Sequence, residues 1–360
     1  MLALAAAFVP LALASSSHFP RFSWDTLPVT WHGSVNSEWN ATELAALAKY
    51  AAVTLEKQAG KDRLKFGKDM EHCQKGADAT ACGCCEEDLM VANFRALREV
   101  APKVQNIAYT NSIIAYPWYS AVQNVFLKSS SYWLRNENGS LQHNIKQSDQ
   151  TWYTWNFAVP AVVDIYKQQC LAMTKTGAVD GCYADGCENV PTPLSAATLA
   201  AYIAGKRGML ADLQQQVPGL VVCGSGGGTM KGVLGASVQN WGKHGAFSTR
   251  EIPMLQKAVA AGAMFSAKGH AVCDNAGDPD SAAVQTELAA FLVAAGEHSY
   301  YRCGSWSHTD VPWFPVYDKK LGEPLGNATL ANGVYTRGFK SGTKVTFDTK
   351  TEVGTIAWAI

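Results

Sequence analysis

The residues with the clearest potential for chemistry lie in one short stretch near the middle of the chain. Residues 178–184 are mostly apolar and are followed by Asp185, Gly186 and, two positions further on, Glu188. This pattern predicts a short buried strand that ends at Asp185. In an α/β barrel, an acid at the end of a strand that leads into a helix points into the mouth, where such folds keep their active sites. Asp185 is therefore the first candidate for a catalytic residue.

The ends of the other predicted strands carry acids, amides, histidines and aromatic rings. Glycoside hydrolysis needs carboxylates in particular, because one carboxylic acid protonates the leaving oxygen while a second carboxylate attacks the sugar or activates water. The residues at these strand ends are Trp31, His32, Glu56, Lys57, Asn111, Ser225, Glu251, Lys268, His270 and Trp306.

Asp185 and Glu251 form the preferred catalytic pair. They end the predicted fourth and sixth strands, whose ends face each other over part of a barrel mouth. Asp185 would be the nucleophile or the base, and Glu251 the acid, with its pKa raised by a drier setting. Other interpretations stay open. In the first, Asp185 only caps the next helix. In the second, Glu251 pairs with Arg250 or belongs to the first turn of a helix. In the third, Glu188 replaces Glu251 as the partner acid.

Several polar residues at the strand ends are predicted to bind substrate. Glu56 and Lys57 either bind sugar hydroxyls or bind only each other. His32 and His270 either contact substrate or have a structural role. Asn111, just past the third strand, and Glu188 complete this polar set.

Aromatic residues are unusually frequent in the excursion between residues 112 and 160. A loop of this length inside a domain is usually functional. We expect about one to three exposed rings to pack against the C–H faces of sugars, with Trp31, Trp118 and Trp155 as the leading candidates. The alternative is that the rings form the loop's own core.

Strands and helices alternate along most of the chain, which indicates a parallel sheet. Eight such units predict an α/β fold of the (β/α)8 TIM-barrel type, followed by a small C-terminal antiparallel β domain. A doubly wound sheet is the competing fold, but no Gly-x-Gly-x-x-Gly follows the first strand. The predicted strands are 22–33 (the first strand with its exit loop), 51–57, 104–109, 178–185, 220–224, 246–251, 264–268 and 298–303. The predicted helices are 40–49, 86–100, 161–173, 194–216, 252–261 and 280–295.

The domain organisation predicted from the sequence has three parts. Residues 1–14 resemble a signal peptide, 15–310 form the barrel with a cysteine-rich insertion at about 58–88, and 311–360 form the β domain. Ten cysteines and three Asn-x-Ser/Thr sequons favour a secreted, disulfide-bonded glycoprotein. Cys182 and Cys187 are expected to form disulfides that stiffen the segment around Asp185.

Composition excludes several classes of partner. The formal net charge is zero, which argues against binding to a nucleic-acid backbone. No stretch after residue 14 is apolar for long enough to span a membrane. No pattern indicates a cofactor. The cluster of Cys82, Cys84 and Cys85 is predicted to form disulfides rather than a metal site. Nothing in the sequence indicates the oligomeric state.

Two segments resemble a known family. One is Gly181-Cys182-Tyr183-Ala184-Asp185, and the other is the tail, with residues 315–326, Gly333-Val334-Tyr335-Thr336-Arg337-Gly338-Phe339 and 342–345. Together they resemble hypothetical glycosyl hydrolase family 15, which is related to the endo-α-1,4-polygalactosaminidase-like barrels. The resemblance implies a (β/α)8 barrel with a small C-terminal β domain, a glycosidase-like activity, and a catalytic role for Asp185.

The sequence thus predicts a secreted glycoside hydrolase that cleaves a poly- or oligosaccharide with two carboxylates. The alternative is a carbohydrate-binding or cell-surface protein that keeps the barrel without the chemistry. A second carboxylate near Asp185 would favour catalysis over binding alone.

Overall fold

The computed structural model describes residues 18–35, 37–57, 86–116, 118–147, 150–224, 226–243, 245–303 and 309–359. The predicted signal peptide lies outside the described residues, as do Ser225, Trp306 and all of the cysteine-rich insertion except residues 86–88.

Eight parallel strands form the central sheet within the described residues, in the order β1-β2-β3-β7-β8-β9-β10-β11. The first and last strands approach each other, because Thr30 N–H donates to the Tyr301 carbonyl at 3.0 Å and Tyr301 N–H donates to Pro28 at 2.9 Å. The sheet is therefore a nearly closed barrel, which confirms the predicted fold class. Its strands are β1 (Trp31–Gly33), β2 (Ala52–Leu55), β3 (Gln105–Asn111), β7 (Gly181–Asp185), β8 (Val221–Cys223), β9 (Gly235–Val238), β10 (Met264–Lys268) and β11 (Ser299–Arg302).

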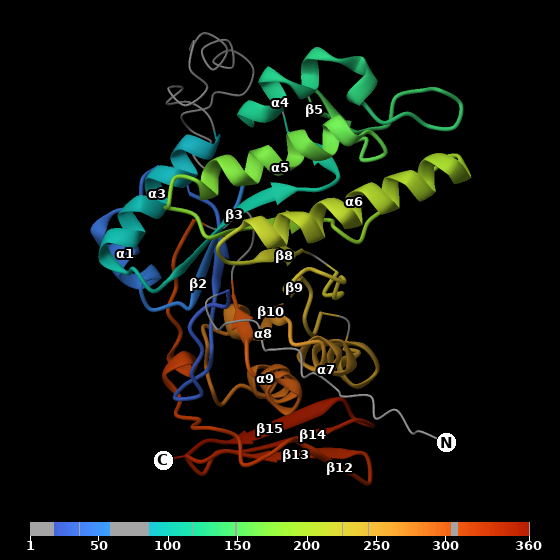
Figure 1. Ribbon diagram of the computed structural model, residues 1–360. Helices are drawn as coiled ribbons and strands as arrows, with labels where there is room; N and C mark the ends of the chain where they lie inside the picture. Colours follow the sequence, from blue (N-terminus) through green and yellow to red (C-terminus); the bar gives the residue numbers. More distant parts are fainter. Residues whose placement is uncertain are drawn as a thin grey trace, which may run out of the picture.

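Helices surround this sheet (Figure 1). Each buries an apolar face, as α3 does with Met90, Phe94 and Leu97, all of which are fully buried. Asn40 caps the first helix, and its side chain accepts hydrogen bonds from the N–H groups of Thr42 and Glu43. The helices are α1 (Ala41–Leu47), α3 (Glu86–Val100), α5 (Pro160–Thr174), α6 (Ala196–Gln216), α7 (Ile252–Ala260), α8 (Ala271–Asp274) and α9 (Ala282–Ala294).

The prediction of a sixth strand at residues 246–251 is wrong. Residues Phe247–Glu251 form a π-helix, η3, that continues into α7, whose first turn contains Pro253. The sixth strand is β9, which is rich in small residues and therefore has a weak strand pattern. A Cβ at Gly235 would lie 2.9–3.0 Å from atoms of Val221 and Val222, so glycine allows β9 to approach β8 closely.

The excursion after β3 folds as a unit with its own small sheet. β4 (Ile114–Ala115), β6 (Gln150–Thr154) and β5 (His143–Gln147) pair in that order, β6 antiparallel to both. Helix α4 (Ser120–Asn124) and two short 3-10 helices, η1 (Phe126–Lys128) and η2 (Ser130–Tyr132), complete it. Figure 1 shows this unit beside α5, at the end of the molecule opposite the C-terminal sheet.

A four-stranded antiparallel sheet ends the chain, as predicted. It contains β13 (Val334–Gly338), β14 (Lys344–Asp348), β15 (Val353–Ala357) and β12 (Thr329–Ala331), a strand that the sequence did not indicate. The sheet packs on α9 (Figure 1). Buried Arg337 fixes this contact, since its Nη1 donates to the carbonyl of Leu292 at 2.7 Å.

Three disulfides join described cysteines. Cys170–Cys182 ties α5 to β7, Cys187–Cys223 ties the segment after β7 to the end of β8, and Cys273–Cys303 ties α8 to the end of β11. Cys182 and Cys187 thus bond to other cysteines on either side of Asp185. The predicted bracing of this segment is confirmed.

Candidate active site

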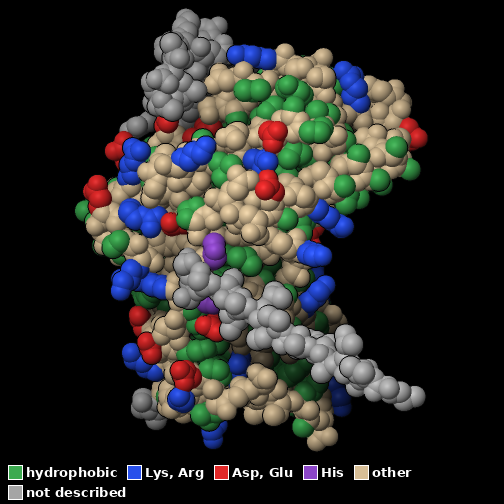
Figure 2. All heavy atoms as spheres, in the orientation of Figure 1, with side chains coloured by type: hydrophobic (Ala, Val, Ile, Leu, Met, Phe, Trp, Pro, Cys, Tyr) green, Lys and Arg blue, Asp and Glu red, His purple; other side chains and the backbone are tan. Residues whose placement is uncertain are grey.

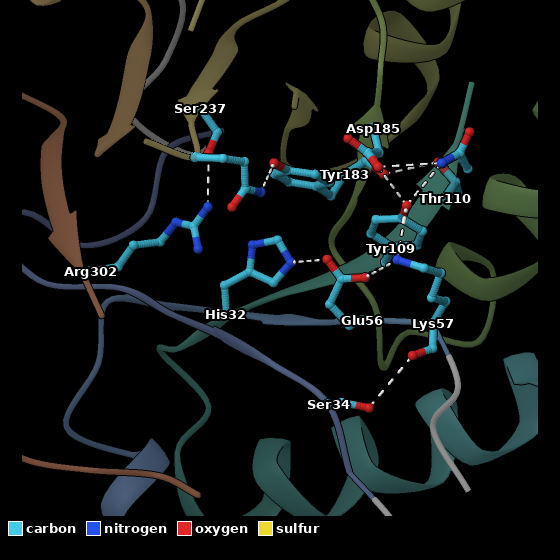
Figure 3. A network of polar contacts seen from close by, with 12 residues as sticks. His32, Ser34, Glu56, Lys57, Tyr109, Thr110, Tyr183, Asp185, Ser237 and Arg302 are labelled. Atoms are coloured by element: carbon cyan, nitrogen blue, oxygen red, sulfur yellow. Dashed lines mark hydrogen bonds and ion pairs between the residues drawn. The ribbon is translucent and has the colours of Figure 1, made fainter. Parts of the chain in front are cut away.

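Asp185 is the last residue of β7, and neighbouring side chains hold its carboxylate (Figure 3). Its Oδ2 accepts hydrogen bonds from Tyr109 OH at 2.7 Å and from Asn111 Nδ2 at 3.3 Å. The amide of Asn111 is oriented by its own Oδ1, which accepts the N–H groups of Ile113 and Ile114 at 2.9 and 2.7 Å. These contacts fix both donors, and hence the direction of the half-buried carboxylate.

The chain can turn sharply after Asp185 because the next residue is glycine. Gly186 has φ +66°, and a Cβ there would lie 2.7 Å from Ile113. Ser112, directly after β3, fixes the alignment of β3 with β7. Its N–H and its hydroxyl both donate to the Asp185 carbonyl, at 2.9 and 2.8 Å.

A second carboxylate, Glu56, lies in the same network directly after β2. It is 2% exposed. One of its oxygens is 2.7 Å from His32 Nε2, and the other accepts from Lys57 Nζ at 3.0 Å. Lys57 Nζ also donates to Tyr109 OH at 3.3 Å. The two carboxylates, Glu56 and Asp185, are therefore connected through one ammonium group and one phenol.

The charge states in this network follow from burial and neighbouring charges. Burial and the charge of Arg302 lower the pKa of His32 to about 4, so His32 is neutral near pH 7 and donates to Glu56. Burial alone would raise the pKa of Glu56, but the Lys57 charge and the His32 hydrogen bond outweigh it, and the pKa is lowered. Burial, together with the two nearby carboxylates, raises the pKa of Tyr109 well above its usual value, so Tyr109 remains a donor.

The strands on the far side of the barrel contribute cations to the interior. Lys268 and Arg302 are partners in the β10–β11 register, so they point to the same face of the sheet. Arg302 is 2% exposed and donates to Ser237 Oγ at 3.3 Å. Figure 3 shows His32 and Glu56 between Arg302 on one side and Lys57 with Asp185 on the other.

Tyr183 packs against His32, with ring centroids 4.7 Å apart, and its OH accepts from Gln239 Nε2 at 2.8 Å. Gln239 directly follows β9, so the sixth barrel strand contributes an amide to the network.

The structure brings together five of the predicted site residues, namely His32, Glu56, Lys57, Asn111 and Asp185. Sequence reasoning missed Tyr109, Tyr183, Gln239 and Arg302. The alternation of side chains along β3 is a signal that would have found Tyr109, because Asn111 and Tyr109 lie two residues apart on the same face.

The choice of Trp31, Trp118 and Trp155 as exposed stacking residues is wrong. Trp31, Trp118 and Trp155 are only 1%, 4% and 1% exposed. Trp155 donates its Nε1–H to the carbonyl of Asn111 at 2.9 Å and so helps to fix the backbone of Asn111. Trp118 stacks on Tyr116 with centroids 4.6 Å apart. These rings form core, as large apolar side chains usually do.

The remaining predicted residues lie elsewhere. Glu251 is 1% exposed in η3, where neighbouring Phe247 packs against Phe347 of the C-terminal sheet. It does not end a strand, so the original reason for pairing it with Asp185 fails. His270 lies at the exit of β10, and its backbone N–H donates to Glu287 at 2.9 Å.

Glu188 is exposed on the segment between β7 and α6, where its Oε2 accepts the N–H of Gly228 at 3.3 Å. A Cβ at Gly226 or Gly228 would lie within 2.0 Å of this carboxylate, so these glycines make room for it.

A buried lysine supports the segment that follows Asp185. Lys206 on α6 is 2% exposed, and its Nζ donates to the carbonyls of Gly186 and Asn189 at 2.7 and 2.9 Å. Burial lowers the pKa of Lys206 to about 7, while the charge of Asp185 acts in the opposite direction.

The sequence model of hypothetical glycosyl hydrolase family 15 matches residues 98–343. The chain belongs to this family. The match covers β3, the whole segment around Asp185, and the first two strands of the C-terminal sheet, β12 and β13. The recognition of the family from the sequence is thereby confirmed. No curated protein matches the chain.

Two solved structures of carbohydrate-active enzymes are similar to this chain. The cycloalternan-degrading enzyme from Trueperella pyogenes is 14% identical with a TM-score of 0.50, over 83% of this chain and 46% of that one. A cycloisomaltooligosaccharide glucanotransferase from Paenibacillus sp. is 13% identical with a TM-score of 0.43, over 70% of this chain and 38% of that one. This family member thus spans less than half the length of either enzyme, and at such identity the likeness concerns the fold alone.

Proposed function

We propose that this protein is a secreted glycosidase that hydrolyses a poly- or oligosaccharide, with Asp185 as its nucleophile or base. The observation that carries the proposal is the position of Asp185 at the carboxyl end of the fourth barrel strand, with Tyr109 and Asn111 both donating to Oδ2. In a barrel enzyme, chemistry takes place at that end of the strands. Membership of a glycosyl hydrolase family supports the same reaction class.

The network fixes the carboxylate of Asp185 before substrate arrives, because Tyr109 and Asn111 both donate to its Oδ2. Lys57, paired with ionised Glu56, places a positive charge next to the Tyr109 hydroxyl. In a retaining reaction, Asp185 attacks the anomeric carbon. In an inverting reaction, it takes a proton from the attacking water.

We assign the acid to Glu188 rather than to Glu251. Glu188 lies on the segment that follows β7, as Gly186 and Cys187 do, and it is exposed. Glu251 is buried in η3 beside the C-terminal sheet. Glu56 is less suitable as an acid, because its lowered pKa keeps it ionised. Glu188 would protonate the leaving oxygen as the glycosidic bond breaks.

The polar residues around this pair are proposed to bind sugar hydroxyls. His32, Glu56, Lys57 and Asn111 belong to the network, and His270 lies at the rim beside Lys268. Carboxylates, amides and ring nitrogens offer the mixed donors and acceptors that hydroxyl groups require.

Secretion is supported by the three disulfides, since such bonds persist in oxidising compartments. The apolar start of the chain and its three sequons agree with export. Among the described residues, no helix combines the length and apolarity that a bilayer crossing requires.

A hydrolysis screen over a panel of glycans tests the proposal, run on the wild type and on Asp185→Asn. We expect the wild type to release reducing ends from at least one glycan, and Asp185→Asn to release almost none. Asp164→Asn is the matched control, because Asp164 lies on α5 with a side chain that is 70% exposed. Binding of a glycan by the wild type without hydrolysis of any would instead identify a carbohydrate-binding protein.

The acid is tested on the same glycan with Glu188→Gln and Glu251→Gln. The proposal predicts a large loss of rate for Glu188→Gln, least severe for substrates with a good leaving group, and a small effect for Glu251→Gln. The reverse order would reassign the acid to Glu251.

A further inference from the structure

A cavity of about 620 Å³ lies beside the segment that carries Asp185. Three parts of the chain enclose it, namely the segment after β7, helix α6, and residues 229–231 between β8 and β9. The lining residues that carry charge are Glu188, Lys206, Arg207 and Lys231. The cavity is large enough for a sugar residue.

Positive charge dominates this lining. Arg207 and Lys231 are cations, Lys206 is a third basic residue, and Glu188 is the single acid among the lining residues. The carboxylate of Glu188 accepts the N–H of Gly228, so part of its hydrogen-bonding capacity is taken by the pocket wall. Figure 2 shows Lys and Arg side chains along the right-hand edge of this face, between the levels of α6 and α7 in Figure 1.

The wall of the cavity is rigidly joined to the candidate active site. Cys187 is bonded to Cys223 at the end of β8. Lys206 donates to the carbonyls of Gly186 and Asn189, which fixes the segment immediately after Asp185. A group bound in the cavity would therefore lie at a fixed position relative to Asp185.

The cations differ in how they can serve a ligand. Arg207 and Lys231 are exposed at the cavity surface, whereas Lys206 is buried behind it. An ammonium group has three N–H donors, and the two carbonyls take two of those of Lys206. Because burial lowers the pKa of Lys206, an anion in the cavity would favour its charged form.

We propose that this cavity is a subsite for an acidic sugar residue, in which Arg207, Lys231 and Lys206 bind a carboxylate or sulfate group. The inference rests on the proposed glycosidase function and specifies its substrate class as an anionic poly- or oligosaccharide. Charge-assisted hydrogen bonds from Arg and Lys are the strong contacts for such groups. A neutral sugar would bring no negative charge to this lining, in which Glu188 is the single acid.

Binding to a glycan array tests the subsite, with the full-length Asp185→Asn protein to prevent turnover. The array carries uronate-containing glycans, their methyl esters, sulfated glycans and their desulfated counterparts. We expect binding to acidic glycans and about tenfold or more weaker binding by Arg207→Gln/Lys231→Gln. Methyl esterification of uronates, or desulfation of sulfated glycans, should weaken binding by a similar factor. If esterification weakens binding, the bound group is a carboxylate; if desulfation does, it is a sulfate.

The matched control is Lys175→Gln/Lys257→Gln, which removes the same charge from exposed positions at the end of α5 and on α7. Its binding should equal that of the parent protein. Equal binding to neutral glycans, no binding to any acidic glycan, or acidic binding that survives Arg207→Gln/Lys231→Gln would each overturn the subsite. If the wild type hydrolyses only neutral glycans, the acidic subsite is rejected and the proposed glycosidase function stands. If the protein binds acidic glycans but the wild type hydrolyses none, the subsite stands and the glycosidase function is rejected.

Discussion

The buried pair of Glu56 and Lys57 should be strongly coupled to protein stability. Their side chains are 3% and 14% exposed, and Glu56 Oε2 lies 3.0 Å from Lys57 Nζ. Removing one partner of a buried ion pair leaves the other charge uncompensated, which costs about 3–5 kcal/mol. Because Lys57 retains some solvent contact, we expect Glu56→Gln and Lys57→Met each to lose about 3 kcal/mol of unfolding free energy, the lower end of that range.

Removing both partners together should be far less costly than the sum. A neutral pair of similar volume has no buried charge to solvate, so Glu56→Gln/Lys57→Met should lose about 3 kcal/mol instead of roughly 6. His32 can still donate to the amide oxygen of Gln at position 56, so this hydrogen bond is retained in the comparison. The coupling energy is then about 3 kcal/mol.

Urea denaturation of the four proteins at pH 7 measures this cycle. The control is the pair of Lys167 and Asp212, which has a similar Nζ–Oδ2 distance of 2.8 Å but side chains that are 18% and 50% exposed. Its cycle should give about 1 kcal/mol or less, as exposed pairs do. Additivity within about 0.5 kcal/mol at Glu56 and Lys57 would refute the claim that the pair is a coupled, buried unit.

Two further predictions concern the neighbours of this pair. Tyr109→Phe removes the 2.7 Å donor to Asp185. A hydrogen bond to a charged group contributes about 1.5–3 kcal/mol, so kcat/KM should fall roughly tenfold to a hundredfold. An unchanged kcat/KM in a folded variant would exclude a role for Tyr109 in positioning Asp185. The pKa of His32 is about 4 when folded and 6.5 when unfolded, so between these values the unfolded state binds more protons. The unfolding free energy should therefore fall as the pH drops from 6.5 to about 4, and His32→Gln should flatten this dependence; a wild-type profile that is flat there would contradict it.

Most of the barrel could be predicted from the sequence because its elements have clear periodicity. The helix at 86–100 and the strand at 264–268 occur at the predicted positions. The exception is β9, where Gly235, Ala236 and Ser237 give little hydrophobic signal. The sequence predicts residues 246–251 as the strand instead, and this error places Glu251 at a strand end although it lies in η3.

The candidate site could be predicted in part, and the limit has a physical cause. Strand ends are visible in a sequence, so Asp185, Glu56 and Asn111 were found. Exposure is a property of the packed fold, so the burial of Trp155 behind Asn111 could not be inferred from residue type. Contacts between distant strands, such as Arg302 beside His32, likewise depend on barrel closure.

The central claim is that Asp185 performs the chemistry, and the most direct measurement is the rate of glycan hydrolysis by Asp185→Asn relative to the wild type. The assay uses a glycan that the wild type cleaves, with thermal unfolding to show that the variant is folded. The account predicts a fall of kcat by about a hundredfold or more, with Asp164→Asn unchanged. Full activity in folded Asp185→Asn would contradict it.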